Sequence, residues 1–145
     1  MITIRHATET DLPQYLALLR HLQPGDPPLD PDKARAAFAR MLAGDQNIVF
    51  LVVSGDILAA SCTLTIIPNL TRNARPYAVI ENVVTDPRFR RQGLGHAVLR
   101  AAQQAAWDAD CYKIMLATGR PGLVPFYQAA GFVVGGKSFF EMRRT

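Results

Sequence analysis

The chain has 145 residues, the size of one ordinary domain, and its 49% hydrophobic and 19% charged residues are close to the averages for soluble globular proteins. This composition excludes intrinsic disorder, a collagen-like repeat and a coiled coil. The formal net charge of +4 suits an anionic small ligand as well as a polyanion, so we expect one folded domain over residues 1–145 with either kind of partner.

The first half of the chain alternates between strand and helix patterns. Strands are predicted where apolar residues alternate or β-branched residues cluster, and helices where apolar residues recur every three to four positions. The predicted elements are a strand at 2–7, helices at 11–23 and 30–42, and strands at 48–53 and 57–67. The turn Ser54-Gly55-Asp56 separates the last two strands, which predicts a β-hairpin.

The second half begins after a loop at 68–76. Its predicted elements are a strand at 77–85, a helix at 93–109, a strand at 112–118, a short helix at 123–130, and strands at 132–134 and 138–143. The alanine-rich segment 93–109 has the strongest helical pattern in the chain. The order of the elements indicates an α/β domain in which one mixed β-sheet carries helices on both faces.

Targeting signals and metal-binding patterns are not evident. There is no run of about 18 apolar residues, and the N-terminal segment is charged where a signal peptide would be apolar, so we expect a cytoplasmic protein that does not bind a membrane. Cys62 and Cys111 lie far apart without a histidine or cysteine at ligand spacing. We expect both to be core residues, and we expect no metal site.

The most informative stretch is 81–97, where an apolar strand passes through a basic turn into a helix N-terminus. Gly93 and Gly95 let the backbone approach a ligand, and the N–H groups of the first helical turn favour a phosphate. The turn adds the positive charges of Arg88, Arg90 and Arg91. A Walker motif would need a lysine here, and a dinucleotide-binding fingerprint would need glycine where the chain has Val98. The pattern therefore indicates a phosphate or pyrophosphate site of another kind.

The run Arg90-Arg91-Gln92-Gly93-Leu94-Gly95 resembles the Gln/Arg-x-x-Gly-x-Gly/Ala signature of the GCN5-related N-acetyltransferases. The strands at 80–85 and 114–118 and the run Phe126-Tyr127-Gln-Ala-Ala-Gly131-Phe132 follow in that family's order and spacing. The resemblance extends over residues 2–143 and implies the GNAT fold. That fold is a mixed central sheet of roughly six to seven strands, flanked by about four helices and splayed at the acetyl-CoA site.

The resemblance also implies how acetyl-coenzyme A binds. Its pyrophosphate is expected on the backbone N–H groups of residues 91–96, and its pantetheine arm is expected to pair with residues 83–85 like an added strand. Backbone groups freed by the splay need such a partner. The implied coenzyme-binding residues are Val83, Val84, Thr85, Arg90, Arg91, Gln92, Gly93, Leu94, Gly95, His96 and Phe126.

Acetyl transfer to an amine requires a base for the ammonium proton, a donor for the tetrahedral oxyanion and an acid for the departing thiolate. Similarity to the family assigns the base to Glu81, acting directly or through water, and the acid to Tyr127. The oxyanion donor is expected to be the backbone N–H of Val83 or Val84. These assignments predict direct attack of the amine within a ternary complex, helped by proximity.

Structural alternatives remain open at this level. Glu81 could instead pair with Arg72 or Arg75 and anchor a loop, and Tyr127 could be an aromatic core residue. The expected acceptor is a primary amine of a small molecule or peptide. The Glu-Asn-Val-Val run at 81–84 is similar to that of the glucosamine-phosphate acetyltransferases within the family, and Arg72 and Arg75 would suit an anionic acceptor.

The sequence is also compatible with a different functional class. The alternative to an enzyme is a non-catalytic acyl-CoA sensor or a partner-binding domain of the same fold. Nucleic acid is not expected, because the basic residues lack interleaved aromatics. A homodimer formed through edge strands near the C-terminus is compatible with the sequence.

Overall fold

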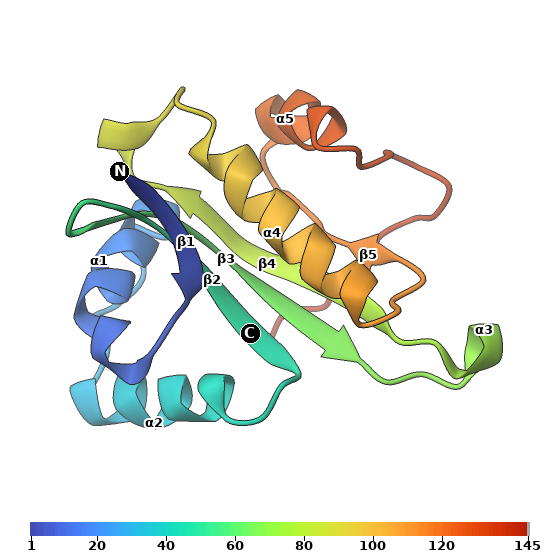
Figure 1. Cartoon of the computed structure of the whole chain (residues 1–145), viewed down its shortest axis with the longest axis horizontal. Coiled ribbons are helices and arrows are strands. Elements are labelled where there is room, and N and C mark those ends of the chain that lie inside the picture. The colour runs from blue at the N-terminus through green and yellow to red at the C-terminus, as the bar shows by residue number, and fades with distance from the viewer. Residues whose placement is uncertain (145) are drawn as a thin grey trace. The chain divides into compact units, whose positions relative to one another are not determined.

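A five-stranded mixed sheet runs through the first of two compact units, Met1–Met115, in the computed structural model, which describes residues 1–144 (Figure 1). The second unit is Leu116–Thr145, and Thr145 itself lies outside the described residues. The expectation of one domain over residues 1–145 stays a prediction.

The strands follow the chain in spatial order. They are β1 (Ile2–His6), β2 (Asn47–Ser54), β3 (Ile57–Ile67), β4 (Tyr77–Thr85) and β5 (Ile114–Met115). Neighbouring strands are antiparallel from β1 to β4, and β5 is parallel to β4. The predicted hairpin of β2 and β3 is confirmed.

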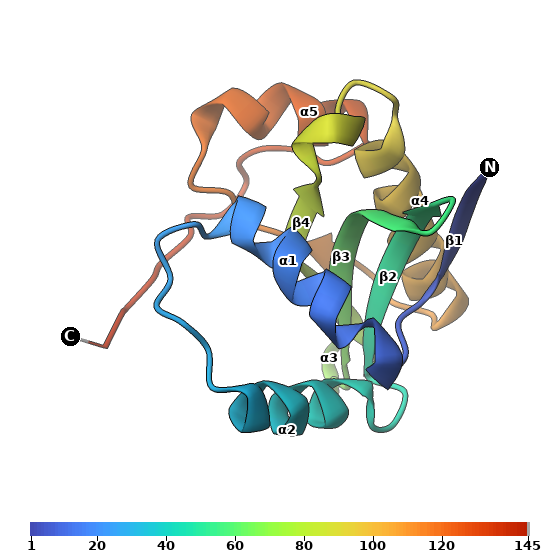
Figure 2. The same ribbon diagram turned by 90° about the vertical axis from the view of Figure 1, so that its left-hand side faces the viewer.

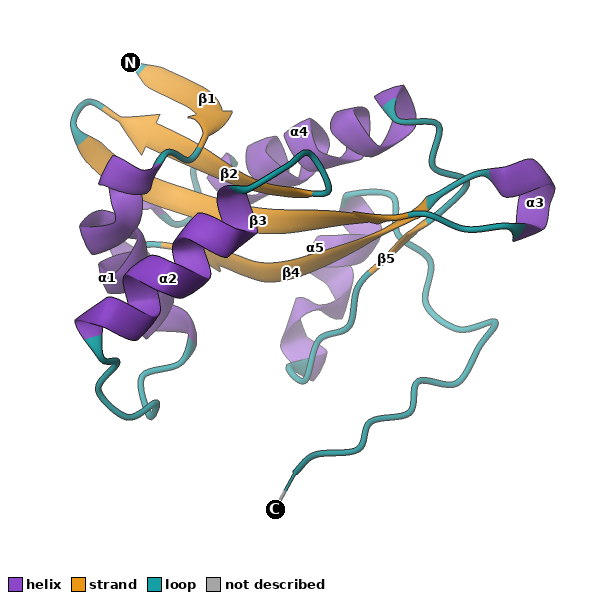
Figure 3. Ribbon diagram, turned by 90° about the horizontal axis from the view of Figure 1, so that it is seen from below, coloured by secondary structure: helices purple, strands orange, loops and turns teal. Residues whose placement is uncertain are grey.

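Helices of the first unit cover both faces of the sheet. The first unit contains α1 (Leu12–Leu22), α2 (Pro31–Leu42), α3 (Thr71–Ala74) and α4 (Leu94–Asp108), with 3-10 turns at Glu9–Asp11 and Pro87–Phe89. The second unit contains a 3-10 turn at Pro121–Leu123 and α5 (Val124–Ala129). Figures 2 and 3 show α1 and α2 against one face of the sheet and α4 against the other. None of the described helices is long and apolar enough to cross a membrane.

The core lies on both faces of β3, which is the central strand of the sheet and is buried over most of its length. On the face covered by α1 and α2, Tyr15 and Phe38 stack at 5.5 Å between ring centroids and pack with Leu51. On the α4 face, the Cys62 thiol lies 3.7 Å from the carbonyl oxygen of Val98. Cys62 and Cys111 are both buried and free, which confirms that they are core residues.

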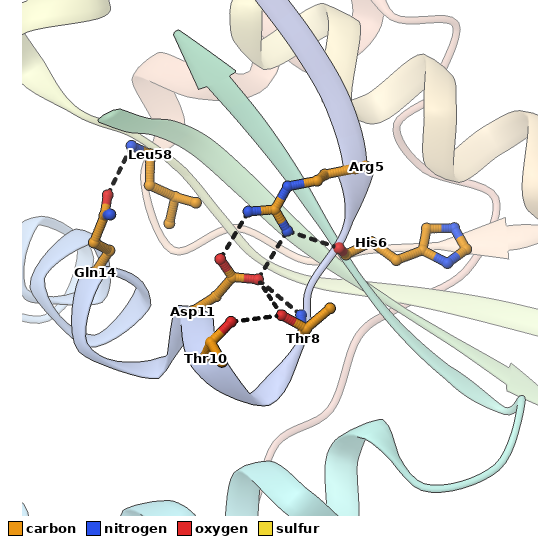
Figure 4. A network of polar contacts seen from close by, with 7 residues as sticks. All are labelled: Arg5, His6, Thr8, Thr10, Asp11, Gln14 and Leu58. Atoms are coloured by element: carbon orange, nitrogen blue, oxygen red, sulfur yellow. Dashed lines mark hydrogen bonds and ion pairs between the residues drawn. The ribbon is translucent and has the colours of Figure 1, made fainter. Parts of the chain in front are cut away.

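A polar network fixes the start of α1 against the sheet (Figure 4). The Arg5 guanidinium donates two hydrogen bonds of 2.8 Å to the Asp11 carboxylate, which also accepts one from the backbone N–H of Thr8. The hydrogen bonds from Arg5 lower the pKa of the Asp11 carboxyl to about 2. One turn later, the side-chain oxygen of Gln14 accepts a hydrogen bond from the backbone N–H of Leu58 at 3.1 Å.

The C-terminal region departs from the sequence-based expectation. Residues 132–144 contain no strand, so the prediction of strands at 132–134 and 138–143 is wrong, and the described chain has five strands in place of six to seven. The predicted strand at 112–118 is reduced to β5, Ile114–Met115. An apolar alternating pattern favours a strand, but a strand also needs a neighbour for its backbone groups, and this second condition is not encoded locally.

We predict that Asp11→Asn lowers the free energy of unfolding by about 1–2 kcal/mol at pH 6. Because the folded pKa of Asp11 lies below its ordinary value of 3.8, its stabilising effect is complete above about pH 4 and is lost as the pH falls through 2. Urea unfolding at pH 6 and pH 2.5 should therefore show a difference between wild type and variant that falls to about a third in acid, because pH 2.5 lies between the folded and the ordinary pKa of Asp11.

Asp26→Asn is the matched control, because Asp26 lies in the exposed turn between α1 and α2. A difference between Asp11→Asn and wild type that is the same at both pH values would contradict the assignment.

Candidate active site

An extra residue in β4 shapes the centre of the candidate site. Ser61 pairs with Val84, and Thr63 pairs with Glu81. The two paired positions are therefore two residues apart on β3 but three residues apart on β4. The additional residue forms a β-bulge at Asn82, whose φ of 53° lies in the left-handed region. The bulge places Glu81 and Val84 on the same face of the sheet, the face covered by α1.

The outer edge of β4 is open beyond its first residues. Pairing with β5 is limited to Ala78 with Ile114 and Val79 with Met115. No other strand of the described chain pairs with this edge, so from Ile80 to the end of β4 its outward backbone groups have no sheet partner. The sequence-predicted residues Val83, Val84 and Thr85 belong to this open stretch.

Asp86 fixes the turn that follows β4. Its buried carboxylate accepts hydrogen bonds from the backbone N–H of Arg88 at 2.8 Å and from the Arg88 guanidinium at 3.1 and 2.9 Å. Hydrogen bonding from the Arg88 side chain lowers the pKa of the Asp86 carboxyl to about 2, so the group is ionised near neutral pH. The Asp86 N–H also donates to the carbonyl of Ala59 on β3. Arg88, which the sequence suggested as a phosphate-binding charge, therefore positions the turn.

The basic turn leads directly into the N-terminus of α4. Gly93 is the N-cap residue with a φ of +77°, and Arg91 also has a positive φ of 63°. The first main-chain hydrogen bond of the helix runs from Ala97 N–H to the carbonyl of Gly93, so the N–H groups of the first turn point beyond the helix end. Arg90, Arg91 and Gln92 are exposed here. This geometry can bind an anion through backbone donors.

Glu81 is exposed and does not pair with the arginines considered from the sequence. Arg75 forms an ion pair with Asp110 at 3.2 Å, and the Arg72 guanidinium lies over the ring of Tyr112, 5.7 Å from its centroid. Both arginines are thus engaged elsewhere. The loop-anchoring alternative for Glu81 loses its partners, and the carboxylate stays accessible on the face of α1.

A buried hydroxyl cluster lies on the same face as Glu81. The Tyr15 hydroxyl contacts Thr63 Oγ1 at 3.4 Å, and Thr63 is the cross-strand partner of Glu81. Burial raises the pKa of the Tyr15 phenol, so this group stays neutral and cannot serve as a base near pH 7. Glu81, in contrast, is an exposed carboxylate on this face that can take up a proton.

Tyr127 and Phe126 lie on α5 in the second unit. Their rings meet edge to face at 5.0 Å, and the Tyr127 ring meets that of Phe132 at 6.3 Å. The backbone carbonyl of Tyr127 accepts a hydrogen bond from Phe132 N–H. The roles of Tyr127 as an acid and of Phe126 in coenzyme binding stay predictions.

Sequence reasoning missed the parts played by Asn82 and Asp86. An asparagine inside an apolar strand is a signal for a left-handed bulge residue, because Asn tolerates positive φ better than most side chains do. Asp86 before Pro87 is a typical turn-capping pair, which the predicted strand at 77–85 leaves out.

A separate pocket of about 380 Å³ lies away from Glu81. Its lining includes Gln46, Ile66 and Ala109. Ile66 shares a strand face with Cys62, and Ala109 directly follows α4, so this pocket is on the opposite side of the sheet. The chemistry assigned to β4 does not use it.

A strand with one open edge, followed by a basic glycine-containing turn and a helix N-terminus, is the arrangement that the resemblance to acyl-CoA-dependent acyltransferases implies. The chain belongs to the acetyltransferase (GNAT) family, whose sequence model matches residues 15–132. It is an acetyl-CoA-dependent N-acetyltransferase.

Similarity to individual proteins extends over most of the chain. The glucosamine 6-phosphate N-acetyltransferase of Trypanosoma brucei brucei is 34% identical over 131 residues, which cover 90% of this chain and 88% of the relative. The glucosamine 6-phosphate N-acetyltransferase 1 of Oryza sativa subsp. japonica is 33% identical over 123 residues, which cover 82% of this chain and 73% of the relative. A solved acetyltransferase structure from Agrobacterium tumefaciens str. C58 is 45% identical with a TM-score of 0.93, covering 98% of this chain and 99% of that chain.

We predict that Asn82→Ala destabilises the protein and lowers its turnover more than Asn82→Gly does. Both changes remove the amide side chain, but only alanine disfavours the left-handed backbone, at a cost of about 1 kcal/mol. Thermal unfolding and steady-state rates of the two variants measure this difference. Equal stability and equal turnover in the two variants would contradict a catalytic need for the bulge conformation.

Proposed function

We propose that the protein transfers the acetyl group of acetyl-CoA to the amine of glucosamine 6-phosphate. The observation that carries the proposal is the open edge of β4, which begins at Ile80 and runs beside the exposed carboxylate of Glu81. The acceptor is supported by curated relatives at 32–34% identity that are named for this activity.

The residues of the turn and strand fit the chemistry of the coenzyme. Backbone donors of residues 91–96 and the cationic side chains of Arg90 and Arg91 suit a pyrophosphate. The free backbone groups of residues 83–85 suit the amides of a pantetheine arm. When bound, acetyl-CoA supplies an activated acyl group as a thioester.

Three groups of the chain share the proton and charge transfers. Glu81 takes the proton of the acceptor ammonium, directly or through water, so that a neutral amine is available for attack. The backbone N–H of Val83 or Val84, oriented by the neighbouring bulge, stabilises the developing oxyanion. Tyr127 donates a proton to the sulfur leaving group.

The buried thiols favour direct transfer between the two substrates. Burial raises the pKa of Cys62 to about 12 and also raises that of Cys111. A thiol without appreciable thiolate is a poor nucleophile and is not suited to carry the acetyl group. This supports amine attack within a ternary complex over transfer through a cysteine thioester.

The test is coenzyme A release with glucosamine 6-phosphate and a panel of other amines. We expect Glu81→Gln to lower kcat by about 10²–10⁴-fold, because a general base typically contributes that much. Calorimetry should show acetyl-CoA binding little changed in this variant. Tyr127→Phe should lower kcat as well, and Glu9→Gln serves as an exposed carboxylate control.

Each failure points to a different error. Unchanged turnover in both Glu81→Gln and Tyr127→Phe would remove their assigned roles. Saturable binding of acetyl-CoA without turnover of any amine would favour an acyl-CoA-binding sensor. No calorimetric saturation at millimolar acetyl-CoA would overturn the proposed function.

We also propose that the chain forms a homodimer through residues 133–142. Large apolar side chains of this segment are mostly exposed, with 90% exposure for Val133, 88% for Phe140 and 98% for Met142. Several exposed large apolar side chains in one short segment are typical of an interface. A second copy brings an identical apolar segment, which makes a symmetric contact the simplest way to cover both.

Size-exclusion chromatography with light scattering tests this contact. We expect wild type to have about twice the chain mass of 15.9 kDa and Phe139→Ser/Phe140→Ser to shift toward a monomer. Leu70→Ser is the matched control, because Leu70 is 90% exposed but lies in the loop between β3 and β4. A wild-type monomer at tens of micromolar would exclude this dimer.

A further inference from the structure

Three hydroxyl groups gather inside the core on the face of the sheet that α1 covers (Figure 2). Ser61 and Thr63 alternate along β3, and Leu51, the partner of Ser61 on β2, belongs to the core on this face. The Tyr15 hydroxyl reaches both residues from α1. The side chains packed around Tyr15 are otherwise apolar. Polar groups in such surroundings are costly unless they are hydrogen-bonded, so this cluster needs an explanation.

The hydrogen-bonding capacity of the three hydroxyls is only partly used. The Tyr15 hydroxyl lies 3.4 Å from Thr63 Oγ1, which is long for two hydroxyl groups. Ser61 Oγ makes no hydrogen bond of standard geometry to the described residues, although it lies close enough to the Tyr15 phenol to act on its pKa. Each hydroxyl carries one proton. Because two bonds suffice to join three hydroxyls in a row, one proton remains for an acceptor outside the cluster.

The remaining proton is best placed at Thr63. Burial raises the pKa of the Tyr15 phenol, so this group keeps its proton and can donate it. Ser61 is 0% exposed, whereas Thr63 is 8% exposed and borders the surface. When Ser61 donates to Tyr15 and Tyr15 donates to Thr63, the Thr63 hydroxyl is left to donate toward solvent. Hydrogen bonds in such a row polarise one another, which strengthens the last one.

Glu81 is an acceptor within reach of Thr63. The two residues are cross-strand partners, and side chains in this position have Cβ atoms about 4.5–5.5 Å apart. A glutamate side chain spans this distance, and an ionised carboxylate only accepts hydrogen bonds. The Glu81 side chain is exposed. Its bond to Thr63 is therefore one that forms when a bound acceptor covers this face, as catalytic hydrogen bonds often do.

A second threonine on the same face shows how a hydroxyl with a purely structural role is bonded. Thr65 follows Thr63 on this face of β3, and its Oγ1 donates to Asn47 Oδ1 on β2 at 2.8 Å. This bond directs the Thr65 hydroxyl away from β4. The β2 partner of Thr63 is Val49, whose apolar side chain cannot accept a hydrogen bond. Thr63 therefore keeps a donor that Thr65 has already used.

We propose that Thr63, supported by Tyr15, is a positioning residue that donates a hydrogen bond to the Glu81 carboxylate in the reacting complex. This inference rests on the proposed function, because it concerns Glu81 as the base. One carboxylate oxygen accepts from Thr63, which directs the other oxygen at the acceptor ammonium or at the water that carries the proton. The ammonium proton moves to the Glu81 carboxylate, and Thr63 keeps its own proton throughout.

The experiment measures kcat and KM with the amine that wild type acetylates fastest. Thr63→Val keeps the shape of the side chain but removes the hydroxyl, and it should lower kcat by about 10-fold while both KM values stay within about twofold. Thr63→Ser restores the hydroxyl and should keep kcat within about threefold. Tyr15→Phe should have a smaller effect than Thr63→Val, because the donor to Glu81 remains. Thr65→Val is the matched control and should leave kcat within about twofold.

A double-mutant cycle shows whether Thr63 acts through Glu81. In the Glu81→Gln background the base is absent, so adding Thr63→Val should change kcat by less than about twofold. Thermal unfolding of Thr63→Val and Thr65→Val shows whether the two losses of a hydroxyl differ in their effect on stability. If Thr63→Val lowers kcat equally with and without Glu81, its effect is structural and the inference is overturned.

The outcomes separate this inference from the function on which it rests. If Glu81→Gln slows acetyl transfer but Thr63→Val does not, the positioning role is wrong and the acetyltransferase assignment stands. If Glu81→Gln leaves kcat unchanged, Glu81 is not the base, and the role of Thr63 is wrong as well. Absence of turnover by wild type with every amine would overturn both the proposed function and this inference.

Discussion

The site depends on β4 having two different edges. One edge pairs with β3 along most of the strand. The other edge pairs with β5 only as far as Val79. Because a backbone group in a sheet interior must be paired, an open edge beside a buried strand is stable only if solvent or a ligand supplies partners. The added residue at Asn82 then lets Glu81 and Val84 share one face despite their odd spacing.

Rigid structure surrounds this open edge. Asp86 is hydrogen-bonded both to β3 and to Arg88, so it connects the end of β4 and the turn toward α4 to the sheet. The buried side chains of β3 anchor the other edge of β4, and α4 packs on one face and α1 on the other. The groups assigned to chemistry are therefore presented by elements whose own positions are fixed by burial, as an active site that relies on preorganisation requires.

The sequence predicted the features that depend on residues close together in the chain, and it missed those that depend on pairing between distant segments. The helix at 93–109 and the strand at 77–85 were located almost to the residue, because periodicity and the Asp86-Pro87 turn act locally. The bulge at Asn82 and the placement of Lys113 beside Tyr77 follow from register between distant segments, which one sequence does not specify. The strands predicted at 132–134 and 138–143 are absent for the same reason. Alternation of apolar residues shows which side chains would share a face, but it does not specify a neighbouring strand to pair with.

Positive charge at both ends of β4 also bears on how the amine becomes reactive. Arg90 and Arg91 lie beyond the carboxyl end of the strand, and Arg72 and Lys113 lie at its beginning, with Glu81 between them. A positive field disfavours an ammonium ion and so lowers the pKa of a bound amine. Cations of the chain that face solvent would then assist Glu81 in taking the proton from the acceptor ammonium.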